Sequence, residues 1–241
     1  MSASLKDIPA ARKNLSKWSE LPDIEKVTDH LSVEGERFLE SVGRILCDCR
    51  QTSRFAVTLL HSHFEVYANE ALVESLDHER RYLITSIRPL KEVMANEEFV
   101  PKSWKFKADP AESGTKRIEI LTWGSRACIP QAPLNDDDEL LMRSLGDIFR
   151  GYKLCNRFGM ALVGPLADTD KIWTEGTDFL GRRLVQEQFP IHEMEARNPM
   201  KTMWVFDEDG KFLITLLCCL RTRDGKSHTG RVHPPGGDLT E

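Results

Sequence analysis

The sequence has no apolar run approaching the roughly 20 residues that cross a bilayer, and no charge of one sign dominates it. We therefore expect no membrane-spanning helix and no membrane partner. The 33 Lys and Arg residues are scattered among 38 Asp and Glu residues, and the formal net charge is −5. A dedicated nucleic-acid-binding protein concentrates positive charge, so this composition argues against a nucleic-acid partner.

Several short motifs are absent as well. The six cysteines form no C-x-x-C pair, and the first residues lack the apolar stretch and small-residue cleavage site of a secretory signal. We expect reduced thiols and a cytoplasmic protein. The sequence also lacks G-x-S-x-G, G-x-x-x-x-G-K-[ST] and G-x-G-x-x-G, which mark a nucleophile elbow, a phosphate-binding loop and a dinucleotide site. Redox chemistry that needs such a cofactor motif therefore has no support in the sequence.

What the sequence does contain is an internal repeat. At an offset of 103 positions, six of the twenty residues from 41 to 60 are identical without a gap. Further blocks match as the offset falls to 96, a drift that loop deletions would produce. The matched blocks are Ser41–Leu46 with Ser144–Phe149, Arg54–Leu60 with Arg157–Val163, Arg80-Arg81 with Arg182-Arg183, Trp104–Phe106 with Trp204–Phe206, and Gly114 with Gly210.

Such a repeat predicts a tandem duplication. We expect an N-terminal extension over residues 1–30 and a first repeat unit over 31–125. A second, degenerate unit follows over 126–224, and a flexible tail rich in glycine, proline and polar residues covers 225–241.

Each repeat unit begins with a helical pattern and continues with short strand-like runs. Apolar residues at helical spacing follow Ser32 and Asn135, which are favourable N-caps with acidic first turns. Runs of β-branched and aromatic residues come next, over 55–64, 71–76, 81–87, 103–107 and 117–123, and over 158–163, 172–174, 183–188, 203–207 and 212–220. This order predicts an α+β fold, a pseudo-twofold duplication of a helix-plus-antiparallel-strands unit with helices on one face. We expect a binding cavity between the halves.

Two histidines, His61 and His63, are the strongest candidates for chemistry. On a strand, residues two apart share a face, so both imidazoles would point the same way. Neutral imidazole suits a divalent transition metal such as zinc or iron. Glu65 could complete the site from the same face, and Glu70, Glu74 and His78 are alternative third ligands. The sequence thus predicts a site formed by His61, His63 and Glu65, with both histidines as metal ligands.

Two other interpretations of the pair stay open. The histidines could act without a metal, as general acid–base or substrate-binding groups. They could also be hydrogen-bonded residues at the end of a core strand that carries Phe55, Val57 and Leu59. The second unit has Gly164 and Leu166 at the matched positions, so the architecture does not itself demand the two histidines.

Three blocks carry a resemblance to other proteins: Arg54–Phe64, Glu70–Glu74 and Ser103–Phe106. They are similar to the R-F-G-x-x-L-L-H-x-H-F, E-x-L-V-E and S-W-x-F blocks of a loose group of uncharacterised fungal proteins, over roughly residues 40–125. Ala56 stands where that group usually has glycine. The resemblance implies a fungal, intracellular origin and makes both histidines part of the group's signature, but it implies no reaction.

Two classes of function fit these observations. The first is an intracellular enzyme that acts on a small organic molecule, by lyase, isomerase, cyclase or hydrolase chemistry at His61 and His63. The second is a non-catalytic protein that binds a small molecule or a partner on a pseudosymmetric scaffold. Either could work as a homodimer, and metal analysis would be the first test to separate them.

Overall fold

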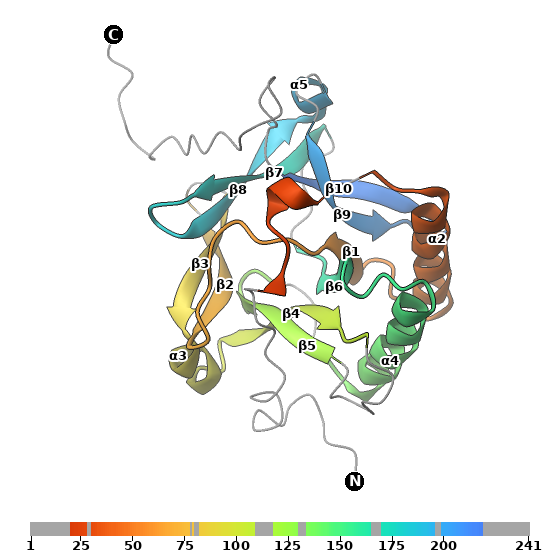
Figure 1. Ribbon diagram of the computed structural model, residues 1–241, viewed down its shortest axis with the longest axis horizontal. Helices are drawn as coiled ribbons and strands as arrows, with labels where there is room; N and C mark the ends of the chain where they lie inside the picture. The colour runs from red at the N-terminus through yellow and green to blue at the C-terminus, as the bar shows by residue number, and fades with distance from the viewer. Residues whose placement is uncertain are drawn as a thin grey trace.

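The chain forms a closed barrel of ten strands with α-helices on its outside, as the computed structural model shows (Figure 1). The structure describes residues 20–27, 30–77, 79, 82–108, 118–129, 134–164, 170–195 and 199–218. The strands are β1 (Phe55–Leu59), β2 (Glu70–Asp77), β3 (Tyr82–Pro89), β4 (Phe99–Phe106), β5 (Ile118–Ser125), β6 (Phe158–Leu162), β7 (Lys171–Asp178), β8 (Arg183–Pro190), β9 (Met200–Phe206) and β10 (Phe212–Cys218). The helices are α2 (Val33–Asp48), α3 (Leu90–Ala95), α4 (Asp136–Gly151) and α5 (Ile191–Glu195), with a 3₁₀ turn, η2, at Ile24–Lys26. The predicted α+β class is confirmed.

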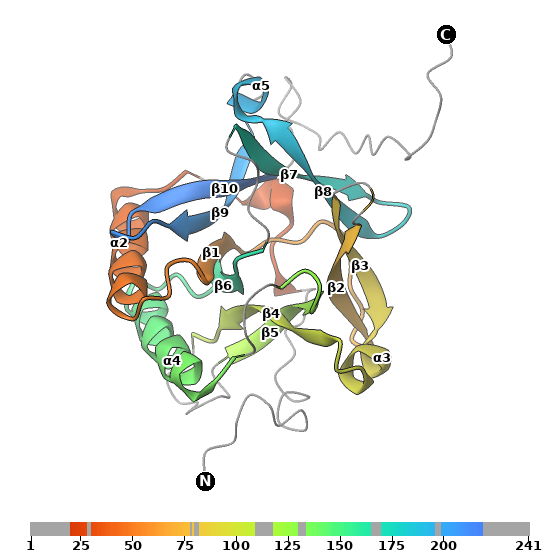
Figure 2. The same cartoon turned by 180° about the vertical axis from the view of Figure 1, so that it is seen from behind.

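The two long helices begin where their caps predict. The Ser32 side chain accepts a hydrogen bond from the Gly35 N–H, at 3.2 Å, at the start of α2. Asn135 and Asp138 form a reciprocal capping box at the start of α4. The acidic run from 136 to 139 therefore serves the helix N-terminus, where negative charge is favourable. In Figures 1 and 2, α2 and α4 lie side by side against one wall of the barrel.

The sheet differs from the prediction in how it closes. The strands follow the order β1-β6-β4-β5-β2-β3-β8-β7-β10-β9, and β9 pairs with β1. Eight of the ten neighbouring pairs are antiparallel, whereas β2–β5 and β7–β10 are parallel. The predicted antiparallel pairing therefore holds for most of the sheet, and the two parallel pairs depart from it. Both parallel pairs join strands that are separated by other strands in the sequence, and such crossovers leave no signal in hydrophobic patterns.

Side chains of the β1–β6 wall alternate between two environments. Val57 and Met160 belong to the apolar core under the long helices. There Phe38 of α2 makes an edge contact with Phe149 of α4, and the two ring centroids are 4.8 Å apart. Thr58, next along the strand, instead lines a cavity inside the barrel. The helices thus cover one side of this wall and leave the barrel interior to other side chains.

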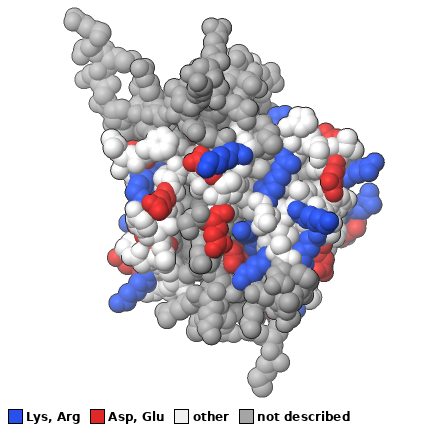
Figure 3. Space-filling model, in the orientation of Figure 1, with Lys and Arg blue, Asp and Glu red and all other residues white. Residues whose placement is uncertain are grey.

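The outer surface bears both signs of charge. On the face in Figure 3, Lys and Arg are interspersed with Asp and Glu, and the described residues form no uniformly basic area there. None of the helices in the described ranges is long and apolar enough to cross a membrane. The predicted tail over 225–241 and most of the predicted extension over 1–30 lie outside the described residues.

Candidate metal centre

His61 and His63 lie just beyond the end of β1, not within a strand as predicted. The strand ends at Leu59, and the next residues run alongside the N-terminal segment 20–27, where Ser62 forms a parallel bridge with Asp23. The Ser62 N–H donates to the Pro22 carbonyl at 2.9 Å, and the Ile24 N–H donates to the Ser62 carbonyl at 3.0 Å. This pairing keeps the backbone extended, so the two histidines still share a side. The two imidazoles therefore point to the same side as predicted, although β1 ends at Leu59 and the predicted strand ran to residue 64.

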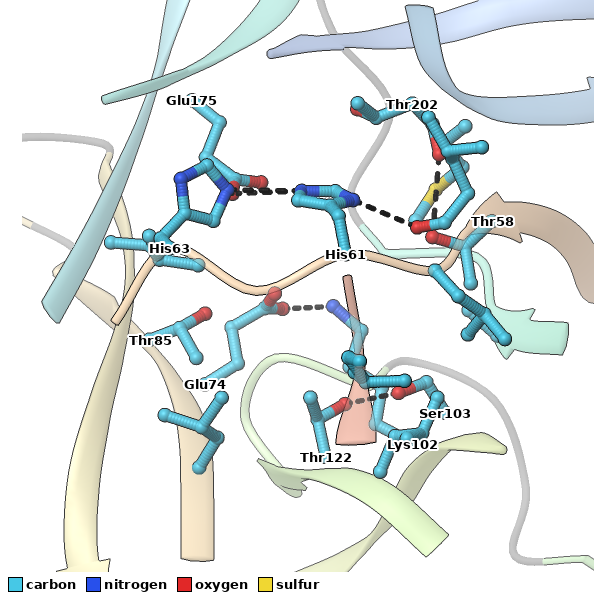
Figure 4. A pocket seen from close by; sticks show the side chains of 18 of the residues that line it. Thr58, His61, His63, Glu74, Thr85, Lys102, Ser103, Thr122, Glu175 and Thr202 are labelled. Atoms are coloured by element: carbon cyan, nitrogen blue, oxygen red, sulfur yellow. Dashed lines mark hydrogen bonds and ion pairs between the residues drawn. The ribbon is translucent and has the colours of Figure 1, made fainter. Parts of the chain in front are cut away.

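The two imidazoles meet a carboxylate from the second half of the chain. Nε2 of His61 and Nε2 of His63 are 2.9 Å apart. Oε1 of Glu175, on β7, lies 2.7 Å from Nε2 of His63 and 3.9 Å from Nε2 of His61. The three ligand atoms lie within 4.8 Å of one another and could hold a metal ion (Figure 4). Ligands at about 2.0–2.1 Å from a tetrahedral ion stand roughly 3.3 Å apart, close to the middle of these separations.

Each of the three groups has a second partner that fixes its orientation. Nδ1 of His61 lies 2.9 Å from the Leu59 carbonyl oxygen, which can only accept, so Nδ1 carries the proton and Nε2 faces the site with its lone pair. Nδ1 of His63 lies 2.9 Å from Oγ1 of Thr177. The Gln186 side-chain amide donates to Oε2 of Glu175 at 3.2 Å. Outer partners of this kind are typical of metal ligands.

The three side chains are withdrawn from solvent, with exposed fractions of 9% for His61, 3% for His63 and 5% for Glu175. Oε1 of Glu175 has no aligned hydrogen-bond donor among the described residues, despite its short distance to His63. Burial alone would raise the pKa of this carboxyl group, but the neighbouring histidines outweigh that effect and hold its pKa far below the usual range. Glu175 is therefore a buried carboxylate that stays ionised beside the two imidazoles.

The same cavity contains a second charged pair. The cavity has a volume of about 100 Å³, and the side chains of His61, His63 and Glu175 all line it. Lys102 of β4 forms an ion pair with Glu74 of β2, and both residues are buried. The hydroxyl groups of Ser103 and Thr122 are 2.6 Å apart nearby (Figure 4). Most of the remaining lining is apolar, as in small-molecule sites where a few polar groups converge.

The structure does not bring the predicted Glu65 to the histidines. Residue 65 is exposed, and its backbone carbonyl accepts a hydrogen bond from Arg182. Glu70 pairs with Arg182 and Glu74 pairs with Lys102, while His78 lies outside the described residues. The ligand that the sequence analysis missed is Glu175. This residue lies on β7, and it comes close to the two histidines only because the barrel closes. The repeat alone did not point to it, because the aligned blocks before and after Glu74 have offsets of 103 and 102, which place Thr177 or Gly176 opposite Glu74.

Comparisons with known protein families, with curated proteins and with solved structures found no match.

Proposed function

We propose that the protein is a metal-dependent enzyme that acts on a small organic molecule, with a divalent transition metal held by His61, His63 and Glu175. The observation that carries this proposal is the convergence of three buried ligand atoms, each with its own outer hydrogen-bond partner. Two imidazoles and one carboxylate form a recurrent ligand set for catalytic zinc and for non-haem iron(II). Such a set leaves coordination positions open.

The chemistry follows from those open positions. A divalent ion there would polarise a carbonyl oxygen or lower the pKa of a bound water, which suits lyase, isomerase or hydrolase reactions. The protein's own residues orient the ligands: Leu59 fixes the tautomer of His61, and Gln186 holds Glu175. Leu60, Leu72 and Leu121 line the cavity and exclude bulk water.

Metal titration of the purified protein tests this proposal. Protein stripped with a chelator should bind one equivalent of Zn²⁺ or Fe²⁺ in calorimetry and should not bind Mg²⁺, which prefers oxygen ligands. His61→Ala and Glu175→Gln should each lower the affinity by at least about tenfold, because each removes one of three ligands.

His192→Ala is the matched control, since His192 is exposed on α5, and it should bind metal as the unaltered chain does. The proposal fails if stripped protein takes up less than a tenth of an equivalent, or if Glu175→Gln and His192→Ala bind equally well.

A second candidate function is metal-free acid–base catalysis by the same three groups. The contact of 2.9 Å between the two Nε2 atoms favours it, because two facing lone pairs would repel unless a proton lay between them. A proton held there, beside Glu175, could be passed to a substrate. Activity that survives chelation but is lost in His61→Ala would support this function over the metal-dependent one.

We also propose that the barrel arose by the predicted tandem duplication. Strand registers support this, because residues that match in the repeat lie across from each other where the halves meet. Val57 faces Met160 in the β1–β6 pair at the offset of 103, and Ile84 faces Val185 in the β3–β8 pair at an offset of 101.

Contacts outside the barrel wall support the same proposal. Arg54 donates to Asp138 in the first turn of α4, and the matched Arg157 donates to the His30 carbonyl just before α2. Each arginine thus reaches the start of the other half's helix.

The duplication would make Glu74 and Glu175 counterparts. Glu74 faces Thr85 in the β2–β3 pair, and Glu175 faces Gln186 in the β7–β8 pair at the same offset of 101. Glu175 would then be the counterpart that pairs with histidines, and Glu74 the counterpart that pairs with Lys102.

A further inference from the structure

Among the described residues, the ammonium group of Lys102 has more hydrogen-bond donors than acceptors. An ammonium group can donate three hydrogen bonds, and Glu74 is the acceptor found for it in the described part of the chain. The Lys102 side chain is only 8% exposed, so bulk solvent does not take up the remaining donors. Those donors lie in a group that lines the cavity shared with the candidate metal centre.

Gly164 leaves room beside this ammonium group. A Cβ atom added at Gly164 would lie 3.6 Å from Nζ of Lys102. A larger side chain directed the same way would meet the lysine, and Gly164 is the position matched to His61 in the repeat. Glycine at position 164 therefore places no side chain of its own against the ammonium group.

The charges that line the cavity set the charge of its ligand. With neutral imidazoles, Glu74, Glu175 and Lys102 leave one net negative charge. A divalent ion at the histidines changes this to one net positive charge. An uncompensated charge is costly in a buried site, so the metal-loaded cavity favours a ligand that carries a single negative charge.

We propose that the metal-loaded cavity binds a small monocarboxylate between the metal and Lys102. This inference rests on the proposed metal site. One carboxylate oxygen would fill an open coordination position beside His61, His63 and Glu175, and the ammonium group of Lys102 would donate to the carboxylate. The volume of about 100 Å³ admits a ligand of only a few non-hydrogen atoms. The apolar lining suits a short hydrocarbon body.

Cobalt-substituted protein tests the inference, because the visible bands of Co²⁺ respond when a coordination position is filled. Acetate is the probe, and acetamide is its neutral counterpart of the same shape. We expect acetate to shift the Co²⁺ spectrum with saturation, and acetamide to leave it unchanged at equal concentration. In Lys102→Met/Glu74→Gln, which removes both charges together and so avoids a buried unpaired carboxylate, acetate affinity should fall about tenfold or more.

Co²⁺ affinity in that double variant should change by less than about threefold, since neither residue is a metal ligand. Lys105→Met is the matched control, because Lys105 lies on the same strand but does not line the cavity, and it should bind acetate normally. If no cobalt binds, the proposed metal site itself is refuted. If cobalt binds, the inference is refuted when acetate binds equally well to the double variant, or equally well without metal.

Discussion

Thr177 lies 2.9 Å from Nδ1 of His63, on the edge of the ring that faces away from the candidate metal centre. A metal on Nε2 requires the proton of the neutral ring to sit on Nδ1, and the Thr177 oxygen can accept a hydrogen bond from it. We predict that Thr177→Val, which removes the oxygen and keeps the shape, lowers zinc affinity about 10–100-fold. Thr177→Ser should restore most of it. Competition with a chromophoric chelator measures both, and equal affinities for Val and Ser would show that the hydroxyl does not orient His63.

The N-terminal segment 20–27 lies over the end of the barrel that faces the viewer in Figure 1. Leu21 is buried against Leu60 and Leu121 and lines the cavity. We predict that Leu21→Ala speeds the release of bound metal to excess chelator by about tenfold or more. A buried Leu→Ala change usually costs about 2–5 kcal/mol of packing, and each 1.4 kcal/mol raises tenfold the population in which segment 20–27 has moved off the end of the barrel.

The equilibrium affinity should change far less, since the metal ligands are intact. Val33→Ala, at a position that is 66% exposed, is the control and should release metal at the original rate. An unchanged release rate in Leu21→Ala would mean that ligands enter the cavity by another route.

Arg182 ties the loop after the histidines to the β7–β8 hairpin. Its guanidinium group donates to both carboxylate oxygens of Glu70, at 3.0 and 2.7 Å, and lies over the ring of Tyr67. The hydrogen bonds from Arg182 hold the pKa of Glu70 below its usual value. A carboxyl group with a lowered folded-state pKa stabilises the fold above its unfolded pKa of about 4.3, and this contribution disappears as the pH falls through the folded-state value.

We therefore predict that Arg182→Met loses up to about 1 kcal/mol of unfolding free energy at pH 7, a modest loss because the pair is partly exposed. The difference from the unaltered chain should shrink toward pH 3. Urea unfolding at both pH values measures it, with the exposed Arg88→Met as control. A difference that stayed constant with pH would assign the effect to packing on Tyr67 instead of to the ion pair.

Gly43 sits in the middle of α2, where alanine would normally stabilise a helix by about 1 kcal/mol. Here a Cβ atom would overlap the carbonyl oxygen of Gly210 and lie 2.7 Å from the Phe206 ring. We predict that Gly43→Ala destabilises the protein by about 1–3 kcal/mol, the usual range for overpacking.

Gly146→Ala on α4 should cost less, because its Cβ would be 3.1 Å from Phe106. Gly151→Ala, with no atom within 4 Å, should be neutral or stabilising. Thermal unfolding ranks the three variants, and a stabilised Gly43→Ala would contradict the tight contact between α2 and the β9–β10 turn.

Much of the fold was predictable because its signals are local. The caps Ser32 and Asn135 mark both long helices, and each predicted strand run overlaps an observed strand. The parallel pairs and the closure of the barrel were not predictable, because hydrophobic patterns do not state which strands are neighbours. The candidate site likewise combines residues with a local sequence signal and a residue that only the strand pairing brings near. The histidine pair was visible from its spacing, whereas Glu175 is brought to it only by the path of β7. The predicted enzymatic function and the small-molecule partner stay predictions.

The positions of β1 and β6 in the barrel have a consequence for synthesis. β1 pairs with β9 and β6 pairs with β4, so a strand from each half completes the wall of the other. When the first half leaves the ribosome, Val57 cannot meet its partner Trp204, and the strand edge stays open until nearly the whole barrel has been made. Open edges promote association with other chains, and pairings so distant in sequence form slowly. A first half expressed alone should therefore find its missing strands only in a second copy of itself.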